Sequence, residues 1–159
     1  MERRRLGSTD IEVSALGFGG AEIGYESVSQ GAVTRLLNAA LDAGLNVVDT
    51  AECYADSETL IGRAASGRRR EFYLFTKVGH AGGWGREDWR PPAIFKSIER
   101  SLERLRTDAL DLVQLHSCPE GVLRRGDASE APTWRSARWV SAAPRSATRA
   151  RARAPSTGC

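Results

Sequence analysis

The sequence predicts an α/β fold in which a parallel sheet is covered by helices. Short apolar runs alternate along the chain with segments whose apolar residues recur at helical spacing. Runs that are apolar on both faces are typical of strands buried in a parallel sheet, and the alternation indicates βα units. About four such units precede residue 126, where the alternation ends with the last unit incomplete.

The chain opens with a predicted β-hairpin. Residues 3–6 and 11–13 are strand candidates, and the segment Gly7-Ser8-Thr9-Asp10 between them is rich in turn-forming residues. Residues 16–18 are the next candidate for a short buried strand, which two glycines end at 19 and 20.

The first helix is predicted between Ser29, a favourable N-cap, and Gly44, which suits a left-handed position after a helix. Its apolar residues follow the spacing of one helical face: Val33, Leu36, Leu37, Ala40 and Leu41. Val47 and Val48 then form a short buried strand, which ends at Asp49.

A second helix is predicted from Asp56 or Ser57, and a strand over residues 72–75 then leads to Lys77. The glycine-rich segment from Gly79 to Gly85 is expected to be a loop. Two prolines at 91 and 92 suit the first turn of a third helix, and the strand after it, residues 110–115, ends at His116.

Four chemically active side chains therefore follow predicted strands: Asp49, Tyr54, Lys77 and His116. Strand ends at one edge of a parallel sheet converge in space, so we expect these side chains to meet. Taken singly, Asp49 could cap a turn, Tyr54 could be a surface phenol, and the other two could be solvated. Together they favour a catalytic site.

Such a site would suit carbonyl reduction. Tyr54 can give a proton to the developing alkoxide, a nearby Lys77 ammonium favours release of that proton, and Asp49 can hold the ammonium in place. His116 can orient the carbonyl oxygen with a hydrogen bond. No side chain supplies hydride, so the chemistry requires a nicotinamide cofactor.

Other motifs in the sequence give little evidence for a function. The segment from Gly17 to Glu22 lacks the third glycine of a dinucleotide fingerprint. Cys53 precedes Tyr54, but with no histidine near it in the sequence we interpret it as an ordinary free thiol. His80, in the glycine-rich segment, is given no role. The three cysteines show no metal-binding spacing, and we expect no metal site.

Composition excludes several classes of function. No run approaches the roughly 18 apolar residues of a membrane span, and the start has no apolar signal segment, so the expected compartment is the cytoplasm. Residues 1–125 carry 17 basic and 18 acidic groups, while residues 126–159 carry six Arg against two acidic groups. The body therefore has no basic patch for nucleic acid.

Residues 126–159 are predicted to be a separate tail. The stretch contains nine Ala, six Arg and five Ser, with Val140 as its only branched aliphatic residue. This composition cannot bury enough apolar surface to offset chain entropy, which predicts disorder. The alternative is an out-of-frame translation of G+C-rich DNA, since Arg outnumbers Lys 21 to 2 in the whole chain.

Several blocks between residues 3 and about 125 resemble the aldo-keto reductase family. Residues 49–58 match its Asp-Thr-Ala-x-x-Tyr-Gly-x-Ser-Glu signature, with Ala55 where glycine is usual. Residues 16–20 are similar to its first strand, and residues 76–77 and 101–116 match two later blocks. Arg106 stands where the family tends to have glycine.

The resemblance implies a TIM barrel, (β/α)8, of which this chain would be the N-terminal half with a hairpin closing the bottom. It implies NADPH reduction of an aldehyde or ketone, with Tyr54 as general acid and Asp49, Lys77 and His116 completing the catalytic set. Gly20, Ala21 and Asp49 would border the cofactor.

The resemblance also implies limits. The second four βα units of the family, which hold most of the cofactor, are not in the sequence, so we expect weak or absent activity in this chain. Open sheet edges would favour self-association. The alternative is a non-enzymatic half-barrel that binds a partner, with a basic tail assisting.

Overall fold

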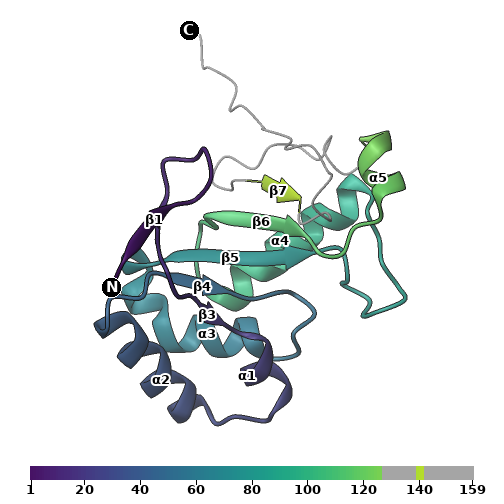
Figure 1. Ribbon diagram of the computed structural model, residues 1–159. Helices are drawn as coiled ribbons and strands as arrows, with labels where there is room; N and C mark the ends of the chain where they lie inside the picture. The colour runs from purple at the N-terminus through teal and green to yellow at the C-terminus, as the bar shows by residue number, and fades with distance from the viewer. Residues whose placement is uncertain (127–138, 142–159) are drawn as a thin grey trace, which may run out of the picture.

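A five-stranded parallel sheet is the centre of the computed structural model, which describes residues 1–126 and 139–141 (Figure 1). Each strand pairs in parallel with the strand that follows it in the chain, which is the topology of a β/α barrel wall. In order across the sheet, the strands are β3 (Phe18–Gly19), β4 (Val47–Asp49), β5 (Tyr73–Val78), β6 (Leu112–Leu115) and β7 (Trp139–Ser141).

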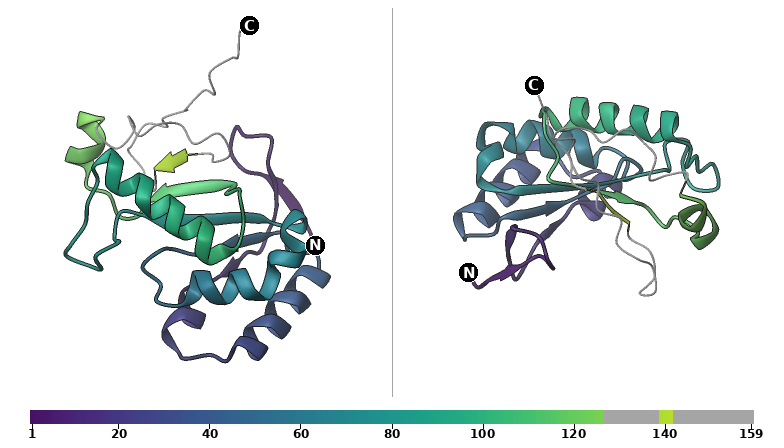
Figure 2. Two further views of the ribbon diagram at one scale, coloured as in Figure 1. Left: turned by 180° about the vertical axis from the view of Figure 1, so that it is seen from behind. Right: turned by 90° about the horizontal axis from the view of Figure 1, so that it is seen from above.

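The long helices lie together on one face of this sheet, as the view from above shows (Figure 2). None of the described helices is long and apolar enough to cross a membrane. The helices are α1 (Ala21–Tyr25), α2 (Gln30–Asp42), α3 (Ser57–Ala65), the 3-10 helix η1 (Ser66–Glu71), α4 (Pro91–Leu105) and α5 (Glu120–Arg125).

Helix α2 shows why the periodic segments fold as predicted. Ser29 accepts a hydrogen bond from the Ala32 amide at 3.3 Å, and Gly44 adopts φ +89° after the helix. The apolar stripe packs into the core between helices and sheet through Val33, Leu37 and Leu41. Leu36 was expected in that stripe but is 53% exposed, because it lies about 100° around the helix from Leu37.

The hairpin of β1 (Arg3–Arg5) and β2 (Glu12–Ser14) is antiparallel, as predicted, and lies beside the ends at which the parallel strands begin (Figure 1). Asn46, just before β4, fixes it there. Its side chain accepts from the Ser14 amide at 2.6 Å and donates to the Glu12 carbonyl at 2.9 Å.

The face of the sheet opposite the helices has its own apolar cluster. Side chains alternate between faces along a strand, so Val48 joins the helix-side core while its neighbour Val47 points the other way. Val47 packs with Phe75 and Leu112, and the hairpin contributes Leu6 and Val13 to the same cluster. The hairpin thus closes one end of the sheet.

Two predictions about strands need correction. The first strand of the sheet begins at Phe18, and Leu16, which was expected to be buried in it, is 66% exposed. The sequence pattern predicted no strand in residues 126–159, yet β7 pairs there with β6, with Trp139 opposite Val113. The rest of the predicted tail, 127–138 and 142–159, lies outside the described residues.

Arg106 provides a test of backbone strain. It ends α4 in the left-handed region, at φ 53° and ψ 47°, where a side chain is disfavoured. We expect Arg106→Gly to raise the free energy of unfolding by about 1 kcal/mol. Arg106→Ala, which keeps a Cβ atom, should give no such gain. Urea unfolding of the three proteins measures the difference, and equal stabilities for the Gly and Ala variants would show that strain is not the cause.

Candidate active site

An ion pair joins two neighbouring strands at the end of the sheet where they finish. Lys77 Nζ donates to Asp49 Oδ2 at 2.5 Å and to the Thr50 carbonyl at 2.9 Å. Gln114 Nε2, on the next strand, donates to Asp49 Oδ1 at 3.1 Å. One carboxylate therefore connects β4, β5 and β6, and the ammonium that it holds is largely buried.

Tyr54 lies in the loop after β4 and contacts both Lys77 and His116. Lys77 Nζ lies over the Tyr54 ring, 4.9 Å from its centroid. The His116 ring stands edge-on to it, with the centroids 5.6 Å apart. The structure thus brings together all four residues predicted from the strand ends. The contact between Lys77 and Tyr54 is one of ammonium with aromatic face.

His116 follows β6 and is half-buried. Its amide donates to the Val78 carbonyl at 3.0 Å, and its Nδ1 lies 3.3 Å from Cys53 Sγ. Burial lowers the pKa of His116 to about 4, and the charges of His80 and Lys77 act in the same direction. The imidazole is therefore neutral at pH 7 and can offer one N–H donor.

Cys53 is closer to a histidine than the sequence suggested, because the fold brings it to His116. Burial raises the pKa of the Cys53 thiol, with the nearby Glu52 carboxylate adding to the effect. A protonated thiol beside a neutral imidazole is not an activated nucleophile. The structure agrees with the interpretation of Cys53 as an ordinary thiol.

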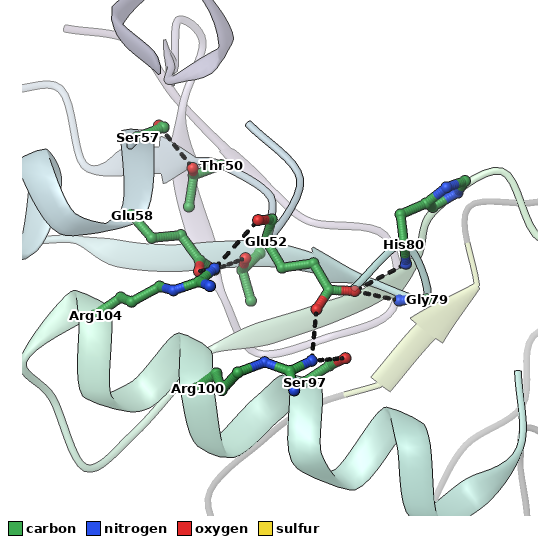
Figure 3. A network of polar contacts seen from close by, with 10 residues as sticks. Thr50, Glu52, Ser57, Glu58, Gly79, His80, Ser97, Arg100 and Arg104 are labelled. Carbon is green, nitrogen blue, oxygen red and sulfur yellow. Dashed lines mark hydrogen bonds and ion pairs between the residues drawn. The ribbon is translucent and has the colours of Figure 1, made fainter. Parts of the chain in front are cut away.

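A buried polar network lies beneath these residues and fixes α3 and α4 to the sheet (Figure 3). Thr76 Oγ1 donates to Glu58 Oε1 at 2.7 Å, and Arg104 Nη1 donates to Glu58 Oε2 at 3.3 Å. The same Arg104 atom donates to the Glu52 carbonyl at 3.2 Å. Burial raises the pKa of Glu58, although these hydrogen bonds oppose the rise.

The residues expected to border a cofactor lie next to Asp49. The Gly20 amide donates to the Asp49 carbonyl at 2.7 Å, and a Cβ atom at position 20 would lie 2.6 Å from Ser57 Oγ. A Cβ atom at Gly19 would meet nothing within 4 Å, and Ala21 begins α1. Gly19, at the end of β3, is therefore exposed with open space beside it, whereas the corresponding space at the buried Gly20 is filled by α3.

Two aromatic side chains stand at the rim of this site. Trp84, in the glycine-rich loop, is 59% exposed, and its ring centroid lies 5.2 Å from that of His116. Tyr25 is 56% exposed and donates from its hydroxyl to the Cys53 carbonyl at 2.9 Å. Within the described part of the chain, no group of three or more His, Cys, Asp or Glu residues could hold a metal ion.

The sequence alone did not identify two residues of this arrangement. Gln114 was not singled out, although its position two residues after Leu112 places it on the same face of the sheet as Leu112. His80 was given no role, yet its side chain is 2% exposed and contacts the His116 carbonyl. No sequence signal for His80 was available, because its contact depends on the path of a loop.

The structure thus contains a parallel β/α sheet with an Asp–Lys pair, a phenol and an imidazole near the end where its strands finish, which is part of a β/α barrel wall. The sequence profile of the aldo/keto reductase family matches residues 15–123. The chain belongs to the aldo/keto reductase family, as the resemblance of its motifs indicated.

Curated relatives agree with this assignment. Over 122 residues the chain is 34% identical to an uncharacterized oxidoreductase, YqkF, of Bacillus subtilis, covering 73% of this chain and 39% of the relative. Over 113 residues it is 35% identical to the methylglyoxal reductase YeaE of Escherichia coli, covering 69% of this chain and 37% of that relative. The chain therefore spans about two fifths of the length of these relatives.

Solved structures confirm the predicted TIM-barrel fold. An aldo-keto reductase of Bacillus halodurans in its holo form matches with a TM-score of 0.70 and 30% identity, over 89% of this chain and 51% of that one. An aldo/keto reductase of Klebsiella pneumoniae, solved with NADP and acetate, matches with a TM-score of 0.62 and 30% identity, over 82% and 46%.

The neutral state of His116 predicts a pH dependence of stability. The unfolded chain protonates this imidazole near pH 6.5, whereas the folded protein keeps it neutral down to about pH 4. The unfolded state therefore binds more protons between these values, and the stability contribution is lost as the pH falls. In urea unfolding, wild type should lose stability relative to His116→Gln between pH 6.5 and 4. A constant difference between the two would contradict the burial of a neutral ring.

Proposed function

We propose that this chain carries the carbonyl-reducing end of an aldo-keto reductase site, in which Tyr54 is the general acid. The observation that carries the proposal is the position of Lys77, bound to Asp49 at 2.5 Å and lying 4.9 Å from the centroid of the Tyr54 ring. A fixed positive charge beside a phenol stabilises the phenolate that remains after proton transfer.

Each of the four residues has a distinct role in this proposal. A substrate carbonyl between Tyr54 and His116 receives a hydrogen bond from the neutral imidazole, which orients it. Tyr54 gives its proton to the oxygen as negative charge develops there. Lys77 keeps its position because Asp49 and the Thr50 carbonyl hold it, so the site does not reorganise during the reaction.

The proposed cofactor is NADPH, which when bound supplies the hydride that reduces the carbonyl carbon. The exposed backbone of Gly19, which pairs with Asp49, fits the approach of its nicotinamide ring, with Gly20 and Ala21 at the border. The Klebsiella structure solved with NADP supports this choice.

The proposed substrate is a small aldehyde or ketone. The aromatic rim of Trp84 and Tyr25 offers apolar contacts around the reacting atoms, and the E. coli relative is named a methylglyoxal reductase. Because the chain spans about two fifths of such relatives, we expect its turnover to be slow compared with theirs. We propose the cytoplasm as its compartment, since Cys53 and Cys118 are both free thiols.

Self-association is part of this proposal. Within the described residues β3 pairs with β4 alone, so one of its edges carries backbone groups that another strand could pair with. A second copy of the chain is the proposed occupant of that edge, and no nucleic acid or membrane is proposed as a partner.

Replacing Tyr54 with Phe tests the proposed acid. We expect Tyr54→Phe to lower the rate of NADPH oxidation in the presence of a small aldehyde by at least about 100-fold, because the proton donor is lost while the ring stays in place. Tyr73→Phe is the matched control, since Tyr73 lies at the beginning of β5, at the opposite end from Lys77. The assay needs a high concentration of protein. A wild-type rate equal to background, or turnover that survives in Tyr54→Phe, would contradict the proposal.

A further inference from the structure

A buried carboxylate outside the four proposed catalytic residues controls how the chain leaves β5. Glu52 Oε1 accepts hydrogen bonds from two successive amides, those of Gly79 at 2.7 Å and His80 at 2.9 Å (Figure 3). The Glu52 side chain is only 1% exposed, and its other oxygen faces Arg100 at 3.5 Å. Glu52 thus connects the loop after β4 to the loop after β5.

His80 continues this connection to the third loop. Its Nε2 lies 2.6 Å from the carbonyl oxygen of His116. A carbonyl oxygen only accepts, so Nε2 must carry a proton, while Nδ1 makes no hydrogen bond within the described residues and lies 3.5 Å from the Glu87 carboxylate. The rings of His80 and His116 also meet edge-on, with centroids 5.1 Å apart.

The backbone and the ring of His116 are consequently both held in place. Its amide donates to the Val78 carbonyl, its carbonyl accepts from His80, and its ring contacts Cys53. Cys53 is the neighbour of Glu52 in the chain, so the contacts form a closed ring: Glu52, His80, His116 and Cys53. Tyr54 follows directly after Cys53.

We propose that Glu52 and His80 are positioning residues that set the orientation of the His116 imidazole toward Tyr54. His80 acts on His116 directly, and Glu52 acts by holding the backbone from which His80 projects. The inference rests on the proposed function for the catalytic value of that orientation, but the geometry that it describes can be tested without turnover.

A purely structural role would not need this arrangement. Removing a carboxylate from water costs free energy, and a strand exit can be fixed by backbone hydrogen bonds alone. The Glu52 carboxylate here accepts both amides through one oxygen, while the second oxygen has no hydrogen bond. The buried Glu52 carboxylate therefore holds His80, the residue that contacts His116, in one position.

The first test uses the unaltered full chain and nuclear magnetic resonance of its histidine rings. The chain contains only two histidines, His80 and His116, so their signals are readily assigned. We expect His80 Nε2 to carry a proton that is protected from exchange with water. A His80 ring protonated at Nδ1 alone, or an Nε2 proton that exchanges freely, would overturn the inference.

Variants at position 80 supply the second test. His80→Phe fills the space but has no donor, so the His116 carbonyl loses its hydrogen bond and the His116 ring signals should shift. His80→Gln retains an N–H donor and should keep the His116 signals close to those of wild type. His116 signals in His80→Phe that match wild type would overturn the inference.

Ser57→Ala is the matched control. It removes a buried hydrogen bond between Ser57 and Thr50, 2.8 Å long, from the same loop region, without touching the ring of contacts. The His116 signals should be unchanged in this variant. Shifts as large as those of His80→Phe would show that any loss of buried polarity has the same effect, which would overturn a specific positioning role.

Turnover separates the inference from the proposed function. If the chain reduces carbonyls, His80→Phe should lower kcat by about 10-fold to 100-fold with little change in KM, since orientation and not binding is lost. An equal loss in His80→Gln, or a loss confined to KM, would overturn the positioning role. A wild-type chain without turnover would contradict the proposed function, while the histidine spectra would still decide the geometry.

Discussion

The ion pair between Lys77 and Asp49 is the interaction on which the site depends. Both groups lie at the finishing edge of the sheet, where desolvating them costs free energy that an isolated pair rarely recovers. Here each group makes a further hydrogen bond, because Gln114 donates to the second carboxylate oxygen and the Thr50 carbonyl accepts from the ammonium. The pair therefore requires three strands in one register, and it links the geometry of the site to the folding of the sheet.

The same ammonium adds to the effect of burial on His116. Burial lowers the pKa of the imidazole, and the nearby positive charge of Lys77 acts in the same direction, so the imidazole stays neutral. The site thus contains one fixed cation, Lys77, one neutral donor, His116, and one phenol between them. These are separate roles, and the fold keeps them apart by placing each residue on a different strand or loop.

Much of this arrangement was predictable because it follows from local rules. A polar residue after a buried strand, as with Asp49 and His116, needs no knowledge of the whole chain, since parallel strands finish at one edge. The caps and apolar face of α2 are equally local. In contrast, the burial of His80 depends on a loop path set by Glu52, and the exposure of Leu16 depends on where pairing with β4 begins. Strand β7 is only three residues long and lies in a stretch with few apolar residues, and its pairing with β6 is a long-range contact.

The backbone conformation helps to orient the side chains of the proposed site. Among the described non-glycine residues, positive φ values occur at Ser27, Ala55, Arg106 and Ser117. Two of these follow proposed catalytic residues directly: Ala55 comes after Tyr54, and Ser117 comes after His116. A left-handed residue turns the chain sharply away, so each side chain before it is left projecting at the edge of the sheet, at a cost of about 1–2 kcal/mol per residue.

Such strain persists only where surrounding contacts determine the conformation. The hydrogen bonds that fix the amide and carbonyl of His116 provide that determination beside Ser117. The strained turn at Ser117 and the contact with His80 therefore both act on the peptide that follows His116.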